Sequence, residues 1–308
     1  MEKNKTISIV KLVLRILVGC IFITSSTMKL LSIDEFELYI YSFGMFDFIF
    51  CTVISRLLIA FEFLTGIFLA AKTFYKYAWW ATMLMLTGFT LFLIYVAYFR
   101  NDANCHCFGD FVELNPINSI IKNLVTIIVL LFIKKDDTDY RFRFKKLFIG
   151  LAFAAAVIVP FVVFPMDAVY TKIANSESDV NVEVFEVLKT DTTITNLNID
   201  EGKQLMAFFM SGCKFCKLGI KKVHSIVEQN DLDKSRIKVM ISGSDEGIAK
   251  FKGETETADL QYFSIHPVLS INVVYGSFPT FALIENGKVV KTMDLRGVDE
   301  KELIEWLK

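Results

Sequence analysis

Residues 204–216 read QLMAFFMSGCKFC, an apolar run that leads directly into two cysteines three positions apart. The run is short and bounded, which favours a strand buried in the centre of a sheet. The lysine-rich stretch that follows, to about residue 229, has a helical pattern. Cys213 therefore stands at the start of a helix, where the partial positive charge of the helix N-terminus favours a thiolate. We expect Cys213 to be the attacking thiol and Cys216, one turn deeper, to be the resolving thiol.

The segments around this stretch predict a mixed α/β domain. The alternation at residues 182–187 predicts a strand before the run, and residues 237–241 predict another after it. Residues 276–284 and 289–293 predict a late hairpin, and residues 299–308 an amphipathic closing helix. Pro279, which follows Phe278, is expected to be a cis proline that holds the backbone beside Cys213 for pairing with a substrate.

Two alternatives to redox chemistry exist for the cysteine pair, a zinc site and a purely structural disulfide. A structural zinc site needs four ligands, and no second Cys/His pair accompanies Cys213 and Cys216. His224 lies two turns along the helix, where we expect it to be exposed, and His266 lies in a segment inserted between the predicted strands. The pattern therefore favours a redox-active pair.

Residues 182–308 resemble thioredoxin-like proteins through the order strand, CxxC, helix, strand and proline-led hairpin, and through Arg296-Gly297 before the closing helix. The resemblance implies Cys213 as nucleophile, Cys216 as resolving thiol and Pro279 as the cis proline. The chain departs from the family in three places. Ser211-Gly212 replaces the usual Trp, Lys-Phe separates the cysteines, and Ala207 occupies the position of the inward-pointing acid. The long gap from Cys216 to Pro279 resembles extracytoplasmic proteins of the TlpA type.

The part of the chain before residue 166 is too apolar for a soluble domain. Of all 308 residues, 54% are hydrophobic and 30 are Phe. A membrane-spanning helix needs about 20 apolar residues, and five segments are candidates: residues 7–31, 48–71, 77–99, 116–133 and 147–165. Pro160 is expected to kink the fifth. The first has no small-x-small cleavage site after it, so we interpret it as an uncleaved helix rather than a secretory signal.

The expected fold is therefore multi-domain. An α-helical transmembrane bundle of four helices plus a fifth linking helix precedes an α/β thioredoxin-like domain. We place the bundle at residues 1–135, the intervening loop and fifth helix at 136–170, and the α/β domain at 171–308, after a polar linker at 171–179. The net charge of −1 gives no electrostatic reason to expect a nucleic acid partner.

Basic residues in short loops predict the orientation. The N-terminus and the loops after the second and fourth spans are basic, whereas the loops after the first and third spans are acidic. The charges counted are Lys3, Lys5, Lys72, Lys76, Lys134, Lys135, Arg141, Arg143, Lys145 and Lys146 against Asp34, Glu35, Glu37, Asp47, Asp102, Asp110 and Glu113. We expect a multi-pass protein of the bacterial inner membrane with a cytoplasmic N-terminus and a periplasmic or otherwise extracytoplasmic thioredoxin-like domain.

Four further cysteines lie in the membrane part. Cys105 and Cys107 flank His106 in the outward loop after the third span, Cys51 lies at the outer end of the second span, and Cys20 lies near the middle of the first. A disulfide between Cys105 and Cys107 would close a small strained ring, which favours an oxidising pair. Cys51, Cys20 and His106 are candidate relay residues. The alternative for Cys105-His106-Cys107 is a soft-metal site for copper.

Residues 7–133 resemble the MauE/DoxX group of redox-associated membrane proteins. The resemblance rests on Arg15, Lys29, Glu62 and Gly66, together with the motif CHCFGD at residues 105–110. It implies help in forming or maintaining disulfides in exported proteins. Charged residues inside spans are costly and normally paired. We expect Arg15 to pair with Glu62 as a contact that stabilises the bundle, with a proton relay as the alternative.

The direction of electron flow follows from the positions of the cysteines. None is predicted at the cytoplasmic face, which argues against import of reducing equivalents. We therefore predict a membrane-bound thiol–disulfide oxidoreductase in which Cys213-Cys216 oxidises exported-protein thiols. Cys105-Cys107 then reoxidises that pair, and a quinone held near Cys20 and Cys51 accepts the electrons, with no metal expected. The alternatives are reductive thiol maintenance for cysteine or haem maturation, a copper metallochaperone, and a structural anchor that only binds exported clients.

Overall fold

The computed structural model describes residues 2–100, 104–112, 114–134, 139–140, 143–173, 178–190 and 197–308. Its contacts divide the chain into two compact units. Residues 1–40 and 50–165 form the first, and residues 41–49 and 166–308 form the second. The division at 165/166 falls inside the predicted linking region 136–170. Four charges used for the predicted orientation, Asp102, Glu113, Lys135 and Arg141, and residues 174–177 of the predicted linker lie outside the described residues.

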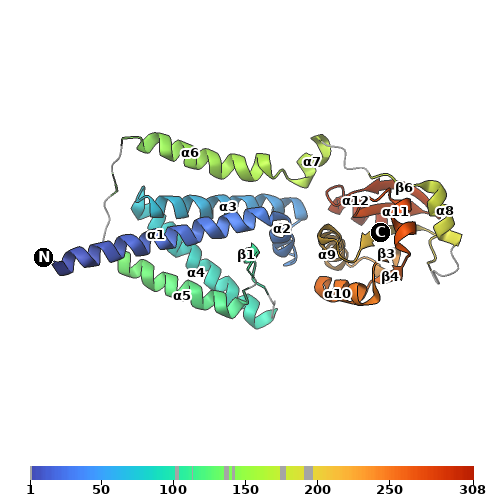
Figure 1. Cartoon of the computed structure of the whole chain (residues 1–308), viewed down its shortest axis with the longest axis horizontal. Helices are drawn as coiled ribbons and strands as arrows, with labels where there is room; N and C mark the ends of the chain where they lie inside the picture. Colours follow the sequence, from blue (N-terminus) through green and yellow to red (C-terminus); the bar gives the residue numbers. More distant parts are fainter. Residues whose placement is uncertain are drawn as a thin grey trace. The chain divides into compact units, whose positions relative to one another are not determined.

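The first unit is built from long apolar helices (Figure 1). In chain order its elements are α1 (Glu2–Leu31), α2 (Ile33–Tyr41), α3 (Phe48–Ala70), α4 (Tyr75–Phe99), β1 (Cys107–Asp110), α5 (Pro116–Ile133) and α6 (Lys145–Ile158), which continues as a π-helix at Val159–Val163. Among the described residues, five helices are long and apolar enough to cross a membrane. They match the five predicted spans, whereas the short helix α2 in the first loop was not predicted.

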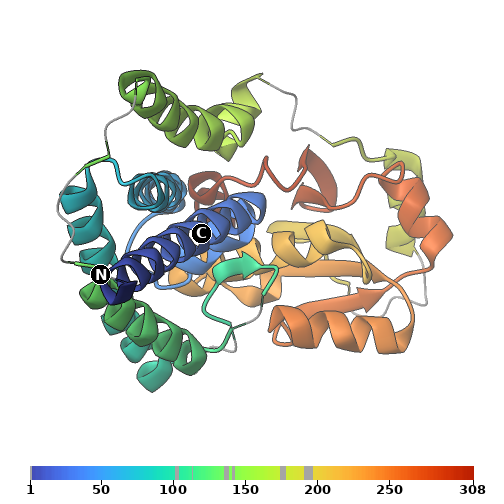
Figure 2. The ribbon, with the colours of Figure 1, turned by 60° about the vertical axis from the view of Figure 1, so that its left-hand side comes forward.

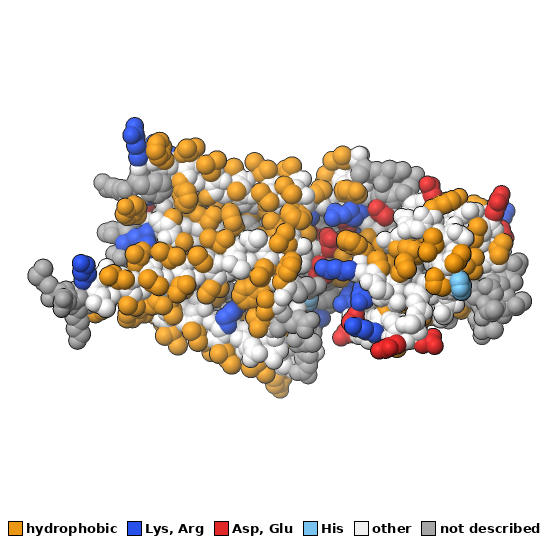
Figure 3. All heavy atoms as spheres, in the orientation of Figure 1, with side chains coloured by type: hydrophobic (Ala, Val, Ile, Leu, Met, Phe, Trp, Pro, Cys, Tyr) orange, Lys and Arg blue, Asp and Glu red, His pale blue; other side chains and the backbone are white. Residues whose placement is uncertain are grey.

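The outer surface of this unit is apolar. Figure 3 shows hydrophobic side chains over most of the visible face of the helices, and large apolar residues such as Leu84, Ile128 and Val162 are exposed. A soluble domain would bury such residues, whereas lipid tails solvate them. The five spans and their apolar surface identify a multi-pass membrane protein.

Helices α1 and α3 cross at two glycines. A Cβ atom on Gly19 would lie 2.7 Å from the Gly66 carbonyl oxygen, and a Cβ on Gly66 would lie 2.9 Å from the Gly19 carbonyl oxygen. Small residues let membrane helices approach closely where no hydrophobic effect drives them together. This crossing sets the register of the two helices, so that residues beyond Gly19 on α1 face residues before Gly66 on α3.

The fifth span changes its helical geometry at the proline. Because Pro160 lacks an N–H group and crowds the preceding turn, α6 gives way to the π-helix at this point. The buried Arg56 guanidinium of α3 donates to the carbonyl oxygens of Pro160 (3.1 Å) and Phe164 (2.8 Å) and forms an ion pair with Glu37. These bonds supply partners for carbonyls that the irregular turn leaves without an intrahelical donor.

The second unit contains a sheet of five strands within residues 197–308: β2 (Lys203–Met210), β3 (Ile237–Ser242), β4 (Gln261–Ser264), β5 (Thr280–Glu285) and β6 (Lys288–Met293). Their order is β4-β3-β2-β5-β6. The β2/β3 and β3/β4 pairs are parallel, and the β2/β5 and β5/β6 pairs are antiparallel. The central strand β2 is buried from Gln204 to Phe209, as its uninterrupted apolar run predicts.

Helices cover this sheet (Figure 2). They are α8 (Val182–Thr190), α9 (Lys214–Gln229), α10 (Asp245–Thr255), α11 (Pro267–Val273) and α12 (Glu300–Leu307), and α7 (Asp167–Ile173) precedes them. Gly219 of α9 lies against β5, where a Cβ would come within 2.8 Å of the Phe281 ring. The strand order and the helix that follows the CxxC motif give the predicted α/β thioredoxin-like fold.

One predicted strand is wrong. Residues 182–187 alternate between apolar and acidic residues, yet they form α8. Phe185 and Leu188 are buried at a spacing of three, whereas Val182 and Val187 are exposed. The helical period therefore places both Phe185 and Leu188 in the core, whereas the period of two in a strand would point them to opposite faces. Tertiary packing of these two side chains decides for the helix over the strand.

Candidate functional site

The CxxC motif lies where β2 passes into α9. Cys213 is the N-cap of α9, and its Sγ accepts a hydrogen bond from the backbone N–H of Cys216 at 3.3 Å. The Cys213 side chain is partly exposed, whereas Cys216 is buried. The motif thus offers one sulfur to solvent and keeps the other inside.

The two thiols differ strongly in acidity. Hydrogen bonding from the Cys216 thiol lowers the pKa of Cys213 to about 6, and the backbone N–H groups of Cys216 and Phe215 and the nearby Lys217 add to this effect against partial burial. Burial raises the pKa of Cys216, and its hydrogen bond to Cys213 raises it further. At neutral pH these pKa shifts favour the thiolate of Cys213 and the protonated thiol of Cys216.

Pro279 lies beside this site. The Phe278–Pro279 peptide bond is cis, as predicted. Strand register pairs Phe208 of β2 with Thr280 of β5, so Pro279 flanks the end of β2 that runs into Cys213. On the other side, Ser211 packs against Gly243, where a Cβ would meet the Ser211 hydroxyl at 2.0 Å. Ser211 thus fits closely against the loop after β3, whereas a Cβ on Gly212 would meet no atom within 4 Å.

A second pair of cysteines lies in the loop between α4 and α5. The Sγ atoms of Cys105 and Cys107 are 2.7 Å apart, and the Cys105 Sγ is 3.0 Å from the Ser119 hydroxyl of α5. Both side chains are buried, with 2% and 3% of their surface exposed. Hydrogen bonding from Cys107 lowers the pKa of Cys105 to about 6, with help from Ser119 and Lys122. The hydrogen bond to Cys105, together with burial, raises the pKa of Cys107 well above its ordinary value.

This loop folds back onto α1. Strand β1 contacts α1, as Figures 1 and 2 both show. Gly109 has φ +60°, and a Cβ there would lie 2.0 Å from the Ser32 hydroxyl and 2.9 Å from the Met28 carbonyl oxygen. Only glycine fits this approach and this backbone conformation. The Ser25 hydroxyl of α1 completes the contact by donating to the Cys107 carbonyl oxygen at 2.7 Å.

Near the loop, Glu62 of α3 forms an ion pair with Lys29. The prediction that Glu62 pairs with Arg15 is wrong. The Lys29 Nζ lies 2.7 Å from Glu62 Oε2, and the Ser25 hydroxyl lies 2.7 Å from Glu62 Oε1. The antiparallel crossing at Gly19 and Gly66 explains the difference, because it brings the later part of α1 to the level of Glu62 and sets Arg15 nearer to Ala70.

A cavity adjoins this pair. It has a volume of about 600 Å³ including its mouth. Its lining comes from α1, α2, α3, α4, β1 and α5, and includes Cys107, Ser25, Lys29, Glu62, Lys122, Asn123 and Thr126 together with apolar and aromatic side chains. The bundle therefore contains a recess with apolar walls and several polar groups, and one of the loop cysteines belongs to its lining.

Comparison with known proteins agrees with both halves of this description. Residues 7–134 match the family model described as methylamine utilisation protein MauE. The chain is also 28% identical to Protein TlpB of Flavobacterium psychrophilum over 282 aligned positions, which cover 75% of this chain and 76% of that protein. No solved structure matches significantly.

The chain therefore joins a membrane domain similar to MauE to a thioredoxin-like domain. These similarities indicate a membrane-associated redox function that involves thiols and disulfides.

The remaining candidate residues of the MauE-like domain are not gathered at one place. Cys20 is exposed on the outer surface of the bundle, and Cys51 is fully buried in α3. Neither lines the cavity that Cys107 lines. The His106 ring packs 4.7 Å from the Tyr39 ring of α2, and His106 has φ +50° in the tight turn between the cysteines. The relay roles of these three residues stay predictions.

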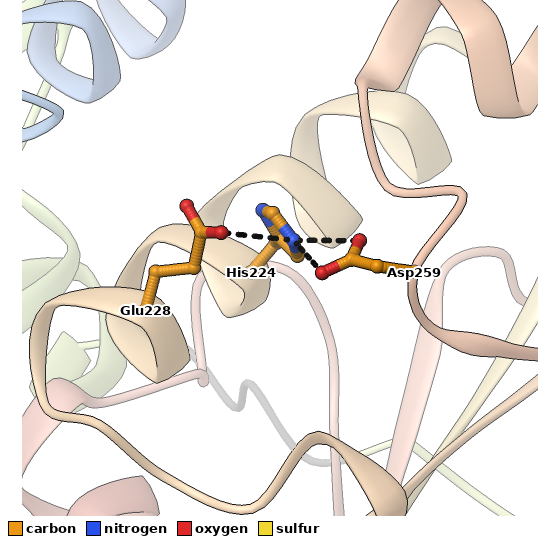
Figure 4. A group of neighbouring side chains, drawn as sticks. All are labelled: His224, Glu228 and Asp259. Carbon is orange, nitrogen blue, oxygen red and sulfur yellow. Dashed lines mark hydrogen bonds and ion pairs between the residues drawn. The ribbon is translucent and has the colours of Figure 1, made fainter.

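Among the described residues of the thioredoxin-like domain, one further group combines metal-binding side-chain types. Figure 4 shows His224 of α9 between the carboxylates of Glu228 and Asp259. Its Nε2 lies 2.9 Å from Asp259 and 3.7 Å from Glu228. The Lys234 ammonium bridges the same two carboxylates. Because the Lys234 ammonium already forms ion pairs with both carboxylates, the group is a surface ion-pair network that links α9 to the segment before β4.

Proposed function

We propose that the protein is a membrane-bound thiol–disulfide oxidoreductase that oxidises the thiols of exported proteins. Cys213-Cys216 exchanges with the client, Cys105-Cys107 reoxidises Cys213-Cys216, and a quinone takes the electrons. The observation that carries this proposal is the contrast between the Cys213 thiolate and the buried, protonated Cys216 thiol. Attack and resolution in a mixed disulfide need two such thiols side by side.

The arrangement of spans supports a shared compartment for the two cysteine pairs. With five candidate spans in the described part of the chain, three precede the Cys105 loop and five precede the thioredoxin-like domain. Both numbers are odd, which supports a location of both cysteine pairs on the side opposite the N-terminus. The basic N-terminus and the basic loops favour a cytoplasmic N-terminus, and this orientation supports the oxidising side of an inner membrane as the location of the cysteine pairs.

The loop pair suits the role of an electron acceptor. A thiol of lowered pKa is a good leaving group, so a Cys105–Cys107 disulfide opens readily when a thiolate attacks Cys107. The exchange forms the Cys213–Cys216 disulfide, breaks the loop disulfide and transfers two electrons. Since Cys105 and Cys107 are almost fully buried, the loop has to lift from α1 and α5 for this step, and Gly109 and the Ser25 contact control that movement.

Two alternatives make different use of the same residues. A copper metallochaperone would use Cys105, His106 and Cys107 as ligands, but the Lys122 ammonium, which lines the same cavity as Cys107, disfavours a cation there. A reductive system would keep Cys213-Cys216 as dithiols for client reduction. It would use the same thiol chemistry in the opposite direction.

The redox state of Cys213-Cys216 in cells tests the direction. Alkylation of acid-quenched cells separates dithiol from disulfide, and the comparison is between the wild type and Cys105→Ala. We expect Cys105→Ala to leave the pair more reduced, because its oxidant is gone. Asn118→Ala, an exposed change near the same loop, is the control and leaves the pair unchanged. A more oxidised pair in Cys105→Ala assigns the protein to the reductive alternative.

A further inference from the structure

On the basis of the proposed function, we propose that the cavity beside Cys107 in the MauE-like domain is the binding site for the quinone ring. This differs from the region around Cys20 and Cys51 expected from the sequence, because neither of those cysteines lines the cavity. The argument rests on the lining of the cavity, on its contact with Cys107 and on the polar chain that joins Ser25, Glu62 and Lys29.

The lining matches a flat ring with polar atoms at its edge. Phe36 and Phe89 supply aromatic faces, and the Lys29 ammonium lies 5.6 Å and 5.2 Å from the centres of their rings. Lys122 and Asn123 of α5 add further hydrogen-bond donors. A recess of mostly apolar walls with a few convergent polar groups is the usual form of a small-molecule site. Quinones present an aromatic-like ring and two carbonyl oxygens, which accept hydrogen bonds from such donors.

The location of the cavity favours a ligand that arrives from the bilayer. Its residues lie within the spans α1, α3, α4 and α5, and Ile21, one of the lining residues, also belongs to the exposed apolar surface of the bundle. A lipid-soluble compound reaches such a recess without leaving the membrane. A hydrated metal ion or a soluble thiol does not have this route.

A polar chain runs from the loop to the ion pair. The Ser25 hydroxyl is 2.7 Å from both the Cys107 carbonyl oxygen and Glu62 Oε1. Both oxygens are acceptors, so the Ser25 hydroxyl donates toward the loop and toward the carboxylate of the Lys29–Glu62 ion pair. The hydroxyl therefore joins the loop to the charged wall of the cavity.

The oxidation of Cys105 and Cys107 by the quinone balances in electrons and protons. The Cys105 and Cys107 sulfurs form an S–S bond, and their two electrons pass to the quinone. One proton comes from the Cys107 thiol. The other is the proton that Cys105 released to water on forming its thiolate, and it is taken up again from water. The two protons form the two O–H bonds of a quinol, which leaves into the lipid.

Binding of menadione, a naphthoquinone with no isoprenoid tail, tests the site. The full-length protein with Cys213→Ala and Cys216→Ala is purified in detergent and titrated by equilibrium dialysis, so that the result does not depend on exchange with the thioredoxin-like domain. Lys122→Met removes one donor and keeps the length of the side chain. We expect it to weaken menadione binding roughly tenfold, which is typical of losing a hydrogen bond from a charged group. Asn123→Leu removes a neighbouring hydrogen-bond donor from the same wall of the cavity and provides a second test. Its thermal unfolding transition is compared with that of the parent protein to show that the variant is folded.

Lys11→Met is the matched control, because Lys11 also lies over an aromatic ring, Phe132, but does not line the cavity. It should leave menadione affinity unchanged. 2-Methylnaphthalene, which has the same ring and no carbonyl oxygens, should bind more weakly than menadione to the parent protein. Equal affinities of the Lys122→Met, Asn123→Leu and parent proteins for menadione would overturn the assignment of this cavity, as would the absence of menadione binding. Neither result affects the exchange between Cys213 and clients, which the redox-state experiment tests separately.

Discussion

The Ser25 hydroxyl of α1 donates a hydrogen bond to the Cys107 carbonyl oxygen across 82 positions of sequence, with an Oγ–O distance of 2.7 Å. This bond joins the CHC loop (residues 105–107) to the interior of the bundle, because the same hydroxyl contacts Glu62. It explains why a short CHC loop between two spans is held as a defined structure, and why the ion pair of Lys29 and Glu62 lies next to it.

Cys213 is predicted to react as a thiolate well below the pH at which an ordinary cysteine does. Its pKa of about 6 means that roughly nine-tenths of it is ionised at pH 7. The rate of alkylation by iodoacetamide, measured by mass spectrometry on the reduced protein from pH 4 to 9, should rise with a midpoint near pH 6. Lys217→Met should move the midpoint upward, because a cation that favours the thiolate is removed. A midpoint near pH 9 in the wild type would contradict the electrostatic argument.

Cys216→Ser is predicted to trap a mixed disulfide between Cys213 and a client protein. The variant keeps the exposed nucleophile and removes the buried thiol that resolves the intermediate. Non-reducing gels of acid-quenched cells should show adducts that disappear on reduction. Cys213→Ser is the control and should show none, since the remaining Cys216 is buried and protonated. Adducts of equal intensity in both variants would mean that the roles are reversed.

Gly109→Ala is predicted to loosen the CHC loop. The new methyl group would lie 2.0 Å from the Ser32 hydroxyl in a backbone with φ +60°, so the loop has to move away from α1. In a background where Cys20, Cys51, Cys213 and Cys216 are serine, maleimide should label Cys105 at least several-fold faster. Gly88→Ala is the matched control, because a Cβ there meets no atom within 4 Å. Unchanged labelling in Gly109→Ala would show that this contact does not hold the loop down.

Glu62→Ala is predicted to destabilise the bundle more than the double change Lys29→Met with Glu62→Met. The single change leaves the Lys29 ammonium buried without its carboxylate, which typically costs about 3–5 kcal/mol, whereas removing both charges leaves no uncompensated group. Thermal unfolding of the detergent-solubilised protein, followed by cysteine accessibility, measures the order. If the double variant unfolds at a lower temperature than Glu62→Ala, the Lys29–Glu62 pair contributes more to the stability of the bundle than charge compensation.

Much of the architecture could be predicted from local patterns. The five spans follow from the length of apolar runs, because a bilayer requires about 20 such residues whatever the rest of the chain does. The buried strand before Cys213 and the helix after it follow from a run of apolar residues and a change of period. The cis bond at Pro279 could be predicted because the residues around it match a known family pattern.

The sequence by itself determined the class of the two domains, the places of both cysteine pairs and the presence of charges inside the spans. Only the tertiary structure decided which groups meet. It formed α8 where alternation predicted a strand, because burial of Phe185 and Leu188 outweighs a local pattern. It paired Glu62 with Lys29 because the crossing at Gly19 and Gly66 sets the register. It also placed the polar cavity beside Cys107, since a cavity is formed by residues of several helices and no single segment encodes it.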